Sequence, residues 1–371
     1  MGSLIPVTRT KIIVPRRRAE ILSRSRLIEL MDELLDNRLI IVAAPAGYGK
    51  TSLLVDYAFS TQWPFCWYSL DSLDADPQRF IAHFISAINV RFPQFGKGCM
   101  AALEGMSQDR LDLDLLVSLI INDAYENITE HFVLVLDDFH LVTSSDEIIY
   151  FVNRFIQEVD ENCHLILVSR TLLNLPDLTL MVARSQVGGL SFEELTFQPE
   201  EIQRLLSQNY NLSIGDEEAA ELARESEGWV TGLLLSTQAM GKTSANRLRV
   251  ARVSGVGLYE YLAQQVLAQQ AKEVQTFLLR SALLDEFDER LCEQVIGQAL
   301  GVQAPWRSLM DIVLRFNLFV LPVGEDGQSL RYHHLFQDFL RERIRKERPE
   351  EARKIQARLA EIYIAREEWE R

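Results

Sequence analysis

The sequence has little cysteine and no long apolar run, and each absence excludes a class of protein. Four cysteines are scattered over 371 residues, without a CxxC pair or a histidine at metal-ligand spacing. This argues against a disulfide framework and a zinc site. No apolar stretch approaches the about 20 residues that a membrane helix needs, and we see no secretory signal. We therefore expect a cytoplasmic protein with reduced, mostly buried thiols at Cys66, Cys99, Cys163 and Cys292.

Positive charge is also scarce. The chain has 38 Lys and Arg against 53 Asp and Glu, a formal net charge of −15, which argues against a DNA-binding surface over most of the molecule. The exception is the first 26 residues, where seven cations accompany the single acid Glu20. One interpretation is an arm that binds nucleic acid. We prefer another, in which some of these arginines lie beside a bound nucleotide and the others are solvated. We expect no membrane contact and no direct nucleic-acid binding by this chain.

A glycine-rich octapeptide is the most informative segment. It follows the apolar run 39–43 and leads into an amphipathic pattern, which predicts a buried strand, a turn and a helix in that order. It fits the phosphate-loop pattern, with Ala44 in place of the usual first glycine. Backbone N–H groups and the helix N-terminus would bind the phosphates of ATP or ADP; a glycine-rich connector is the alternative. The predicted binding residues are Pro45, Ala46, Gly47, Tyr48, Gly49, Lys50, Thr51 and Ser52.

The catalytic residues predicted from this pattern are Lys50, Asp137 and Asp138. Lys50 would reach the β and γ phosphates, and the Thr51 hydroxyl would ligate Mg²⁺. The two aspartates end an apolar run, where Asp137 would hold the metal together with Thr51 and Asp138 would orient an attacking water. A helix cap or a solvated turn is the alternative for this pair. Because no glutamate stands at the second position, rapid hydrolysis is not expected.

Unbroken apolar runs at 131–136 and 164–168 are typical of strands buried on both faces of a parallel sheet. They alternate with helical patterns at 21–36, 77–92 and 110–130, with a turn predicted at 94–98. This predicts a doubly wound α/β domain. Ligands of such domains lie at the carboxyl ends of the strands, where Gly47, Asp137 and Arg170 all fall. Arg170 would contact the γ-phosphate, with an ordinary exposed arginine as the alternative.

Beyond this domain the pattern becomes helical. We predict a nucleotide-binding domain over 1–197, an all-α helical domain over 198–285, and a winged-helix domain over 286–350, the last from strand signals at 318–322 and 330–333 between helices. A charged amphipathic helix follows over 351–371. His333 and His334 begin a predicted helix, where adjacent side chains diverge, so a metal site is not predicted there.

Seven short blocks, in shared order and spacing, resemble the maltose-regulon activator group of STAND ATPases. These are signal-transduction relatives of the apoptotic protease activators and of plant resistance proteins. The resemblance covers nearly the whole chain, although each block alone is weak. The blocks are Pro45–Thr51, Trp67–Asp71, Val135–His140, Leu167–Arg170, Glu227–Leu235, Phe277–Leu284 and Tyr332–Leu340.

The resemblance implies that the three domains form a switch. ADP would hold a closed state, and an unknown inducer together with ATP would open it for self-association. Arg170 would act as a phosphate sensor. By the same resemblance, the other nucleotide contacts are Leu22, Ser23 and Arg24 beside the base and ribose, Gly228 and Trp229 on the adenine side, and His333 on the β-phosphate of ADP.

The chain departs from this family pattern in two ways. Relatives continue for several hundred residues into a superhelical repeat sensor and often a LuxR-type DNA-binding domain, whereas this sequence ends at Arg371. It ends in what resembles the start of a helical arm, so sensor and DNA-binding domains are expected in a full-length relative. The segment 184–190 also lacks an expected acidic residue, which leaves Arg184 a weak candidate for a second arginine near the phosphates.

The resulting hypothesis is a slow switch ATPase that regulates transcription or another output. One alternative is an AAA+-like motor or initiator ATPase, which would need brisk turnover and an arginine finger supplied in trans. The other is a nucleotide-bound scaffold that never hydrolyses. Co-purified ADP with slow turnover would indicate the switch, fast multiple turnover the motor, and intact ATP the scaffold.

Overall fold

The computed structural model describes residues 5–106, 111–229, 266–316, 318–323 and 328–365. The chain divides into two compact units, Met1–Ala219 and Ala220–Arg371. The finer division at 197, 285 and 350 stays a prediction.

The first unit is built on a five-stranded parallel sheet in the order β2-β3-β4-β1-β5. Because β1 lies between β4 and β5, the strand that precedes the phosphate loop is central and paired on both edges. This is the α/β architecture that the sequence predicts. The strands are β1 (Leu39–Ala43), β2 (Phe65–Ser69), β3 (Phe132–Asp137), β4 (Cys163–Ser169) and β5 (Val187–Leu190).

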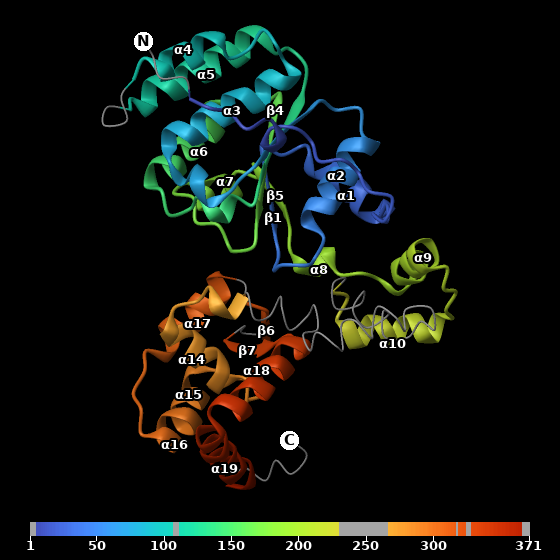
Figure 1. Ribbon diagram of the computed structural model, residues 1–371, viewed down its shortest axis with the longest axis vertical. Coiled ribbons are helices and arrows are strands. Elements are labelled where there is room, and N and C mark those ends of the chain that lie inside the picture. The colour runs from blue at the N-terminus through green and yellow to red at the C-terminus, as the bar shows by residue number, and fades with distance from the viewer. Residues whose placement is uncertain (1–4, 107–110, 230–265, 317, 324–327, 366–371) are drawn as a thin grey trace. The chain divides into compact units, whose positions relative to one another are not determined.

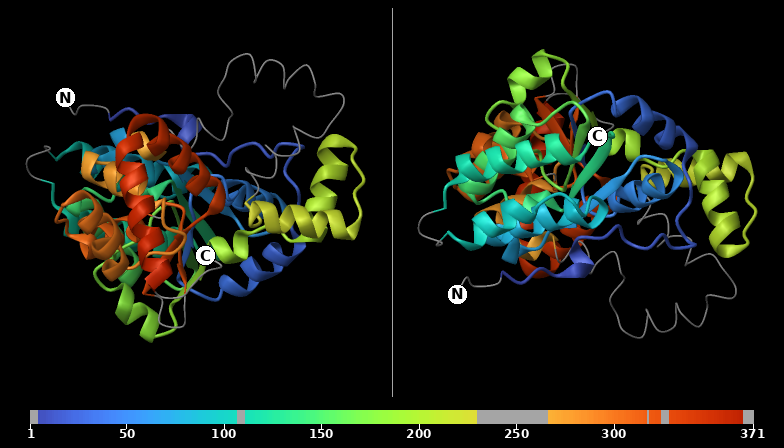
Figure 2. Two further views of the ribbon diagram at one scale, coloured as in Figure 1. Left: turned by 90° about the horizontal axis from the view of Figure 1, so that it is seen from below. Right: turned by 90° about the horizontal axis from the view of Figure 1, so that it is seen from above.

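Helices cover both faces of this sheet (Figures 1 and 2). One side carries α1 (Ser25–Leu34) and α2 (Lys50–Ser60). The other side carries α3 (Pro77–Arg91), α4 (Lys97–Glu104), α5 (Leu113–Asn127) and α6 (Asp146–Glu158). The shorter helices α7 (Leu178–Ala183) and α8 (Phe192–Leu195) flank β5, and α9 (Pro199–Tyr210) follows.

The core explains why the β3 and β4 sequences lack polar alternation. Every residue of both strands is buried, because helices remove both faces from water. On one face, the ring of Phe84 from α3 meets Phe151 and Phe155 of α6 edge-on, with centroids 5.3 and 5.0 Å apart. Such pairs add about 0.5–1.5 kcal/mol each beyond their buried area. The four cysteines are free and buried, as predicted.

Two elements of this unit differ from the sequence-based prediction. The turn predicted at 94–98 ends earlier, at Gly96 with a φ of 94°, and Gly98 lies inside α4. Strand β5 was not predicted, because Gly188 and Gly189 remove the side chains that would show a strand pattern. A Cβ on Gly189 would lie 2.9 Å from the Ile41 carbonyl oxygen, so only glycine fits this close approach of β5 to β1.

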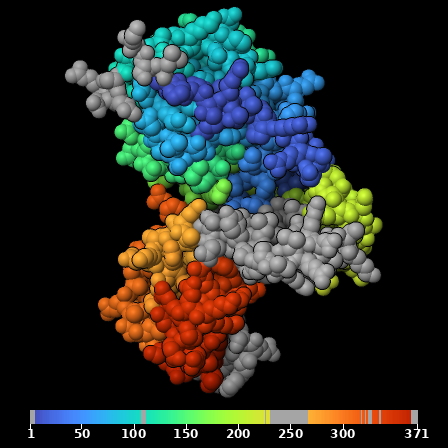
Figure 3. Space-filling model, in the orientation of Figure 1, coloured from blue at the N-terminus to red at the C-terminus, as the bar shows by residue number. Residues whose placement is uncertain are grey.

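The N-terminal segment, dark blue in Figure 3, lies across the surface of the first unit. Its η1 turn (Arg9–Lys11) places the Lys11 ammonium 2.9 Å from Asp71 and against the fully buried Asp74. Arg17 donates through Nε to Asp56 of α2 over 2.6 Å. These cations are therefore bound by acids of the same unit, while Arg16 and Arg18 are exposed.

The second unit combines helices with a β-hairpin, the arrangement of a winged helix. Strand β6 (Val320–Val323) pairs antiparallel with β7 (Ser329–Tyr332), which confirms the predicted hairpin strands. Helix α10 (Asp216–Ser226) crosses the boundary between the units. The helices that follow are α14 (Lys272–Ser281), α15 (Glu289–Cys292), α16 (Gln298–Leu300), α17 (Trp306–Arg315), α18 (His334–Glu347) and α19 (Pro349–Ala365).

Two predictions fall outside the described residues: the helical pattern within 230–265 and the hairpin turn at 324–327. Over the ranges that are described, no helix has both the length and the apolarity to cross a bilayer.

The approach of β5 to β1 can be tested with a pair of glycine variants. Gly189→Ala should lower the free energy of unfolding by about 1–3 kcal/mol, because the added methyl overlaps the β1 backbone. Gly98→Ala should raise it by about 0.5–1 kcal/mol, because nothing lies within 4 Å of a Cβ there and alanine favours the helix. Urea unfolding followed by circular dichroism measures both; equal effects would contradict the close contact.

Candidate functional site

The phosphate loop joins β1 to α2 at the carboxyl edge of the sheet. Gly47 and Gly49 have φ angles of 83° and 80°, in the left-handed region that glycine adopts without steric cost. Helix α2 begins at Lys50, directly after Gly49. The first N–H groups and the positive dipole end of this helix therefore lie at the loop, as an anion-binding site requires.

Lys50 is buried at the base of the loop. Its Nζ donates to the carbonyl oxygens of Ala44 over 2.7 Å and of Pro45 over 2.9 Å. Burial lowers its pKa to about 8, and the nearby Arg170 adds to this effect, whereas Asp138 and Asp137 oppose it. Lys50 is thus a desolvated cation near the carboxylates, held by neutral carbonyl oxygens that a phosphate could replace.

Thr51 faces Asp137 across the gap between α2 and β3. The Thr51 hydroxyl lies 3.2 and 3.1 Å from the two carboxylate oxygens of Asp137. Burial raises the pKa of Asp137 to about 6, and the charge of Asp138 contributes in the same direction. A buried carboxylate with a raised pKa gains from a cation beside it, which is the environment of a metal ligand.

These oxygen donors fit Mg²⁺, which binds through few protein ligands and otherwise through phosphate and water. Thr51 and Asp137 supply a hydroxyl and a carboxylate at the loop. Among the described side chains, no three His, Cys, Asp or Glu form a cluster suited to a metal. A metal at Thr51 and Asp137 would therefore need ligands from a bound nucleotide and water.

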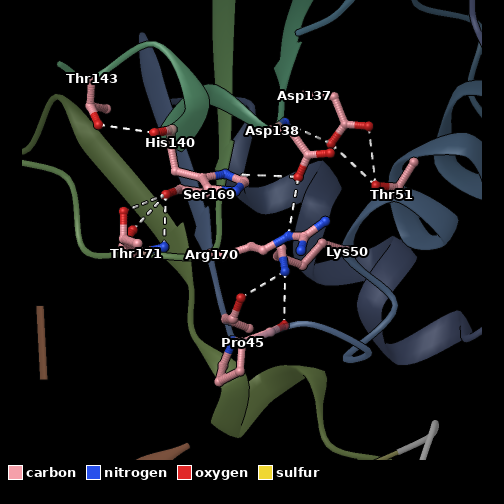
Figure 4. Close-up of polar contacts among 11 residues, drawn as sticks. Pro45, Lys50, Thr51, Asp137, Asp138, His140, Thr143, Ser169, Arg170 and Thr171 are labelled. Atoms are coloured by element: carbon pink, nitrogen blue, oxygen red, sulfur yellow. Dashed lines mark hydrogen bonds and ion pairs between the residues drawn. The ribbon is translucent and has the colours of Figure 1, made fainter. Parts of the chain in front are cut away.

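Asp138 and Arg170 approach each other from the ends of neighbouring strands (Figure 4). The Arg170 Nε lies 3.5 Å from an Asp138 carboxylate oxygen. Asp138 has a φ of 60°, and a left-handed conformation in a non-glycine residue costs about 1–3 kcal/mol. Strain of this kind persists where the surroundings fix the residue, and the Asp138 carboxylate here lies beside Arg170.

His140 joins this group, although sequence reasoning did not select it. Its Nδ1 lies 3.8 Å from Asp138, and it has no hydrogen-bond partner among the described residues. Burial lowers its pKa to about 4, so the imidazole is neutral near pH 7. Its place within the block Val135–His140, two residues after Asp138, is the sequence signal that could have identified it.

The residues predicted beside the base and ribose lie in the N-terminal segment before α1. The Arg24 guanidinium donates to the carbonyl oxygens of Leu195 and Thr196 over 2.8 and 2.6 Å, and to Glu201 over 2.8 Å. Ser23 accepts through its carbonyl oxygen from Arg204 over 2.8 Å. This segment, including the buried Leu22, is thus hydrogen-bonded to α9 and to the residues that precede α9. Arg24 joins these segments; its contact with a nucleotide stays a prediction.

The predicted residues of the second unit also gather together. The Trp229 and His333 rings meet edge-on with centroids 5.5 Å apart, and both residues are buried. The His333 Nε2 lies 3.1 Å from the Ser226 carbonyl oxygen. Gly228, with a φ of 68°, turns the chain between Ser226 and Trp229. Of the remaining candidates in the first unit, Ser52 and Arg184 are exposed.

Comparison with known proteins gives relatives along nearly the whole chain. Residues 263–352 match the family model of the MalT winged helix domain. An HTH-type transcriptional regulator MalT of Yersinia enterocolitica is 30% identical over 369 residues, which are 98% of this chain and 39% of the relative. That of Yersinia pestis is 31% identical over 368 residues, with the same shares covered. The chain thus spans about two fifths of the length of these relatives.

A solved structure supports the fold. The Walker-type ATPase paby2304 of Pyrococcus abyssi aligns with a TM-score of 0.57 at 16% identity, over 92% of this chain and 99% of that chain. At this identity the likeness shows the fold alone, and that fold is the predicted P-loop α/β architecture. The resemblance drawn from the seven sequence blocks is confirmed as well.

The buried Asp137 should make stability depend on pH. A carboxyl whose folded pKa is raised, here to about 6, favours the folded state at low pH and loses that contribution as pH rises through about 6. Asp137→Asn has no charge to bury, so it should be more stable than the wild type by about 1–3 kcal/mol near pH 7 and gain little near pH 4. Urea unfolding across this range, without metal or nucleotide, measures the difference.

The matched control is Asp160→Asn, which removes a carboxylate from an exposed residue of the same unit. It should shift the unfolding free energy by less than about 0.5 kcal/mol. A pH-independent effect of Asp137→Asn would contradict the burial of an ionised carboxylate at this position.

Proposed function

Because this chain is related to the MalT regulators over nearly its whole length, we propose that it is the nucleotide-binding switch of a transcription regulator. In this proposal the chain binds ATP and ADP, hydrolyses ATP slowly, and self-associates in the ATP state. An inducer and DNA would be recognised by other parts of a longer regulator, since the relatives are HTH-type transcriptional regulators of greater length.

The observation that supports this proposal is the gathering of five side chains at one edge of the sheet. Lys50 and Thr51 start α2, Asp137 ends β3 and is followed by Asp138, and Arg170 follows β4. The contacts of 3.1 to 3.5 Å among them join three segments that are far apart in sequence. Cationic, hydroxyl and carboxylate groups in this arrangement suit the phosphates of a nucleotide.

The loop residues would act mainly by position and charge. The N–H groups after Gly47 and Gly49 would donate to the phosphate oxygens, and Lys50 would exchange its loop carbonyls for the β and γ phosphates. Thr51 and Asp137 would hold Mg²⁺, which supplies positive charge against the phosphate oxygens. Each of these groups already lies at the loop, so little reorganisation would be needed on binding.

Hydrolysis would depend on Asp138 and Arg170. Asp138 would orient the attacking water and accept its proton, while Arg170 would stabilise the charge of the γ-phosphate. The 3.5 Å ion pair between the two must loosen before Arg170 can serve a phosphate. Slow turnover is expected for this reason, and it suits a site that resets a switch rather than one that drives a motor.

The switch itself would involve the second unit. We propose that His333 contacts the β-phosphate of ADP and that Gly228 and Trp229 lie on the adenine side. A nucleotide that contacts different groups before and after hydrolysis shifts the population between two conformations. ADP would favour the closed, inactive form, and ATP the form that self-associates.

The first test is removal of the loop cation. Lys50→Ala should abolish nucleotide binding at micromolar concentrations, because it deletes the cation that neutralises the phosphates. Isothermal titration calorimetry with ADP and ATP measures the loss, with Lys97→Ala as a control that removes an exposed lysine of the same unit. Micromolar ATP affinity in Lys50→Ala would overturn the site assignment.

The second test concerns the histidine of the second unit. His333→Ala should release ADP about tenfold faster and favour self-association, because one hydrogen bond to a charged phosphate is lost. His334→Ala, which changes the neighbouring histidine, should behave like the wild type. Stopped-flow release of a fluorescent ADP and light scattering measure the two effects. Unchanged ADP release in His333→Ala would show that this residue does not hold the closed state.

A further inference from the structure

The turn after α10 in the second unit has a strained backbone. Glu227 has a φ of 46° and the next residue, Gly228, a φ of 68°. The turn is closed by hydrogen bonds from the Gly228 N–H to Ala223 over 3.0 Å and from the Trp229 N–H to Ser226 over 2.9 Å. Glycine tolerates this conformation, but a glutamate in it has a steric cost. Strained residues of this kind concentrate at ligand clamps and switch regions.

The carboxylate of Glu227 lies between two donors, Arg331 of β7 and His333, which follows β7. One oxygen is 2.8 Å from the Arg331 guanidinium, and the other is 4.0 Å from Nε2 of His333. The side chain of His333 is only 2% exposed, whereas those of Arg331 and Glu227 are 37% and 24% exposed. A single carboxylate thus faces a buried imidazole and a half-exposed guanidinium with its two oxygens.

The backbone around His333 is held just as tightly. Its N–H donates to the carbonyl oxygen of Phe319 over 2.8 Å, and Phe319 has a φ of 56°, which is an outlier for a bulky side chain. Nε2 of His333 donates to the Ser226 carbonyl oxygen over 3.1 Å. Both segments that fix the imidazole therefore contain a residue in a left-handed conformation, on one side Glu227 and on the other Phe319.

We propose that Arg331 and His333 form an anion site for the phosphates of a nucleoside diphosphate, and that Glu227 occupies this site as an internal competing anion. This inference rests on the proposed function and deepens it, since it adds Arg331 as a phosphate contact and assigns Glu227 a role in regulating release. A nucleotide would displace the carboxylate, and loss of the nucleotide would restore the ion pair.

The chemistry favours such an exchange. Guanidinium binds phosphate and carboxylate in the same two-pronged geometry, and a phosphate offers more charge and more acceptor oxygens. Against this, the carboxylate is part of the chain and is always present at the site. In the proposed exchange these two effects oppose each other, as a reversible switch needs.

The test uses ADP release from the whole chain. Glu227→Gln keeps the size of the side chain but removes the competing charge, so a fluorescent ADP should dissociate about threefold to tenfold more slowly than from the wild type. Arg331→Gln should release it about tenfold faster, and Arg331→Lys should restore part of the difference. When Glu227→Gln is added to Arg331→Gln, it should have little further effect, because the guanidinium that Glu227 pairs with is then absent.

The matched control is Glu221→Gln, which removes an exposed carboxylate from α10, the helix that precedes the Glu227 turn. It should leave ADP release unchanged. ADP release from Glu227→Gln at or above the wild-type rate would overturn the inference, and this variant decides the question even if Arg331→Gln lowers the melting temperature. If that result is found while Lys50→Ala still abolishes ADP binding in the same assay, only the inference about Glu227 fails and the proposed function stands. Failure of the wild type to bind ADP would overturn both.

Discussion

The parallel pairing of β1, β3 and β4 is the constraint on which the candidate site depends. Parallel strands end at the same edge, so the groups that follow β1, β3 and β4 meet there without any long-range recognition of their own. The same pairing buries those groups. Lys50 and Asp137 lie inside the edge rather than on it, and their pKa values move toward each other, to about 8 and about 6. The site therefore holds charges whose burial opposes folding.

The buried charges at this edge are one case in which the candidate site lowers the stability of the fold. Asp138 adds a left-handed backbone to the same edge, and His140 leaves a buried ring nitrogen without a hydrogen bond in the described structure. Apolar side chains at this edge would be more stable. The mostly apolar interiors of β3 and β4, where every residue is buried, are an example. Positions at this edge are thus occupied by groups that suit a ligand, at a cost in stability.

Local sequence patterns predicted much of this arrangement. The glycines of the loop, the apolar runs of β3 and β4, and the aspartates after β3 are short-range signals, and each has a direct physical cause. Long-range side-chain pairs have no such signal. Nothing near Arg24 indicates that it will bind Leu195, Thr196 and Glu201, and β5 is hidden because its glycines are required by a neighbouring strand. Pairing that depends on the assembled fold is absent from local patterns.

One physical theme joins the two units. The groups that we propose for phosphate binding already have internal partners: Lys50 has loop carbonyls, His333 has the Ser226 carbonyl, and Arg331 has Glu227. Binding would then exchange hydrogen bonds rather than add them, so the net gain is small compared with the gross strength of the contacts. Because the net free energy of binding is small, the one phosphate by which ATP and ADP differ would be enough to change which of two conformations is favoured.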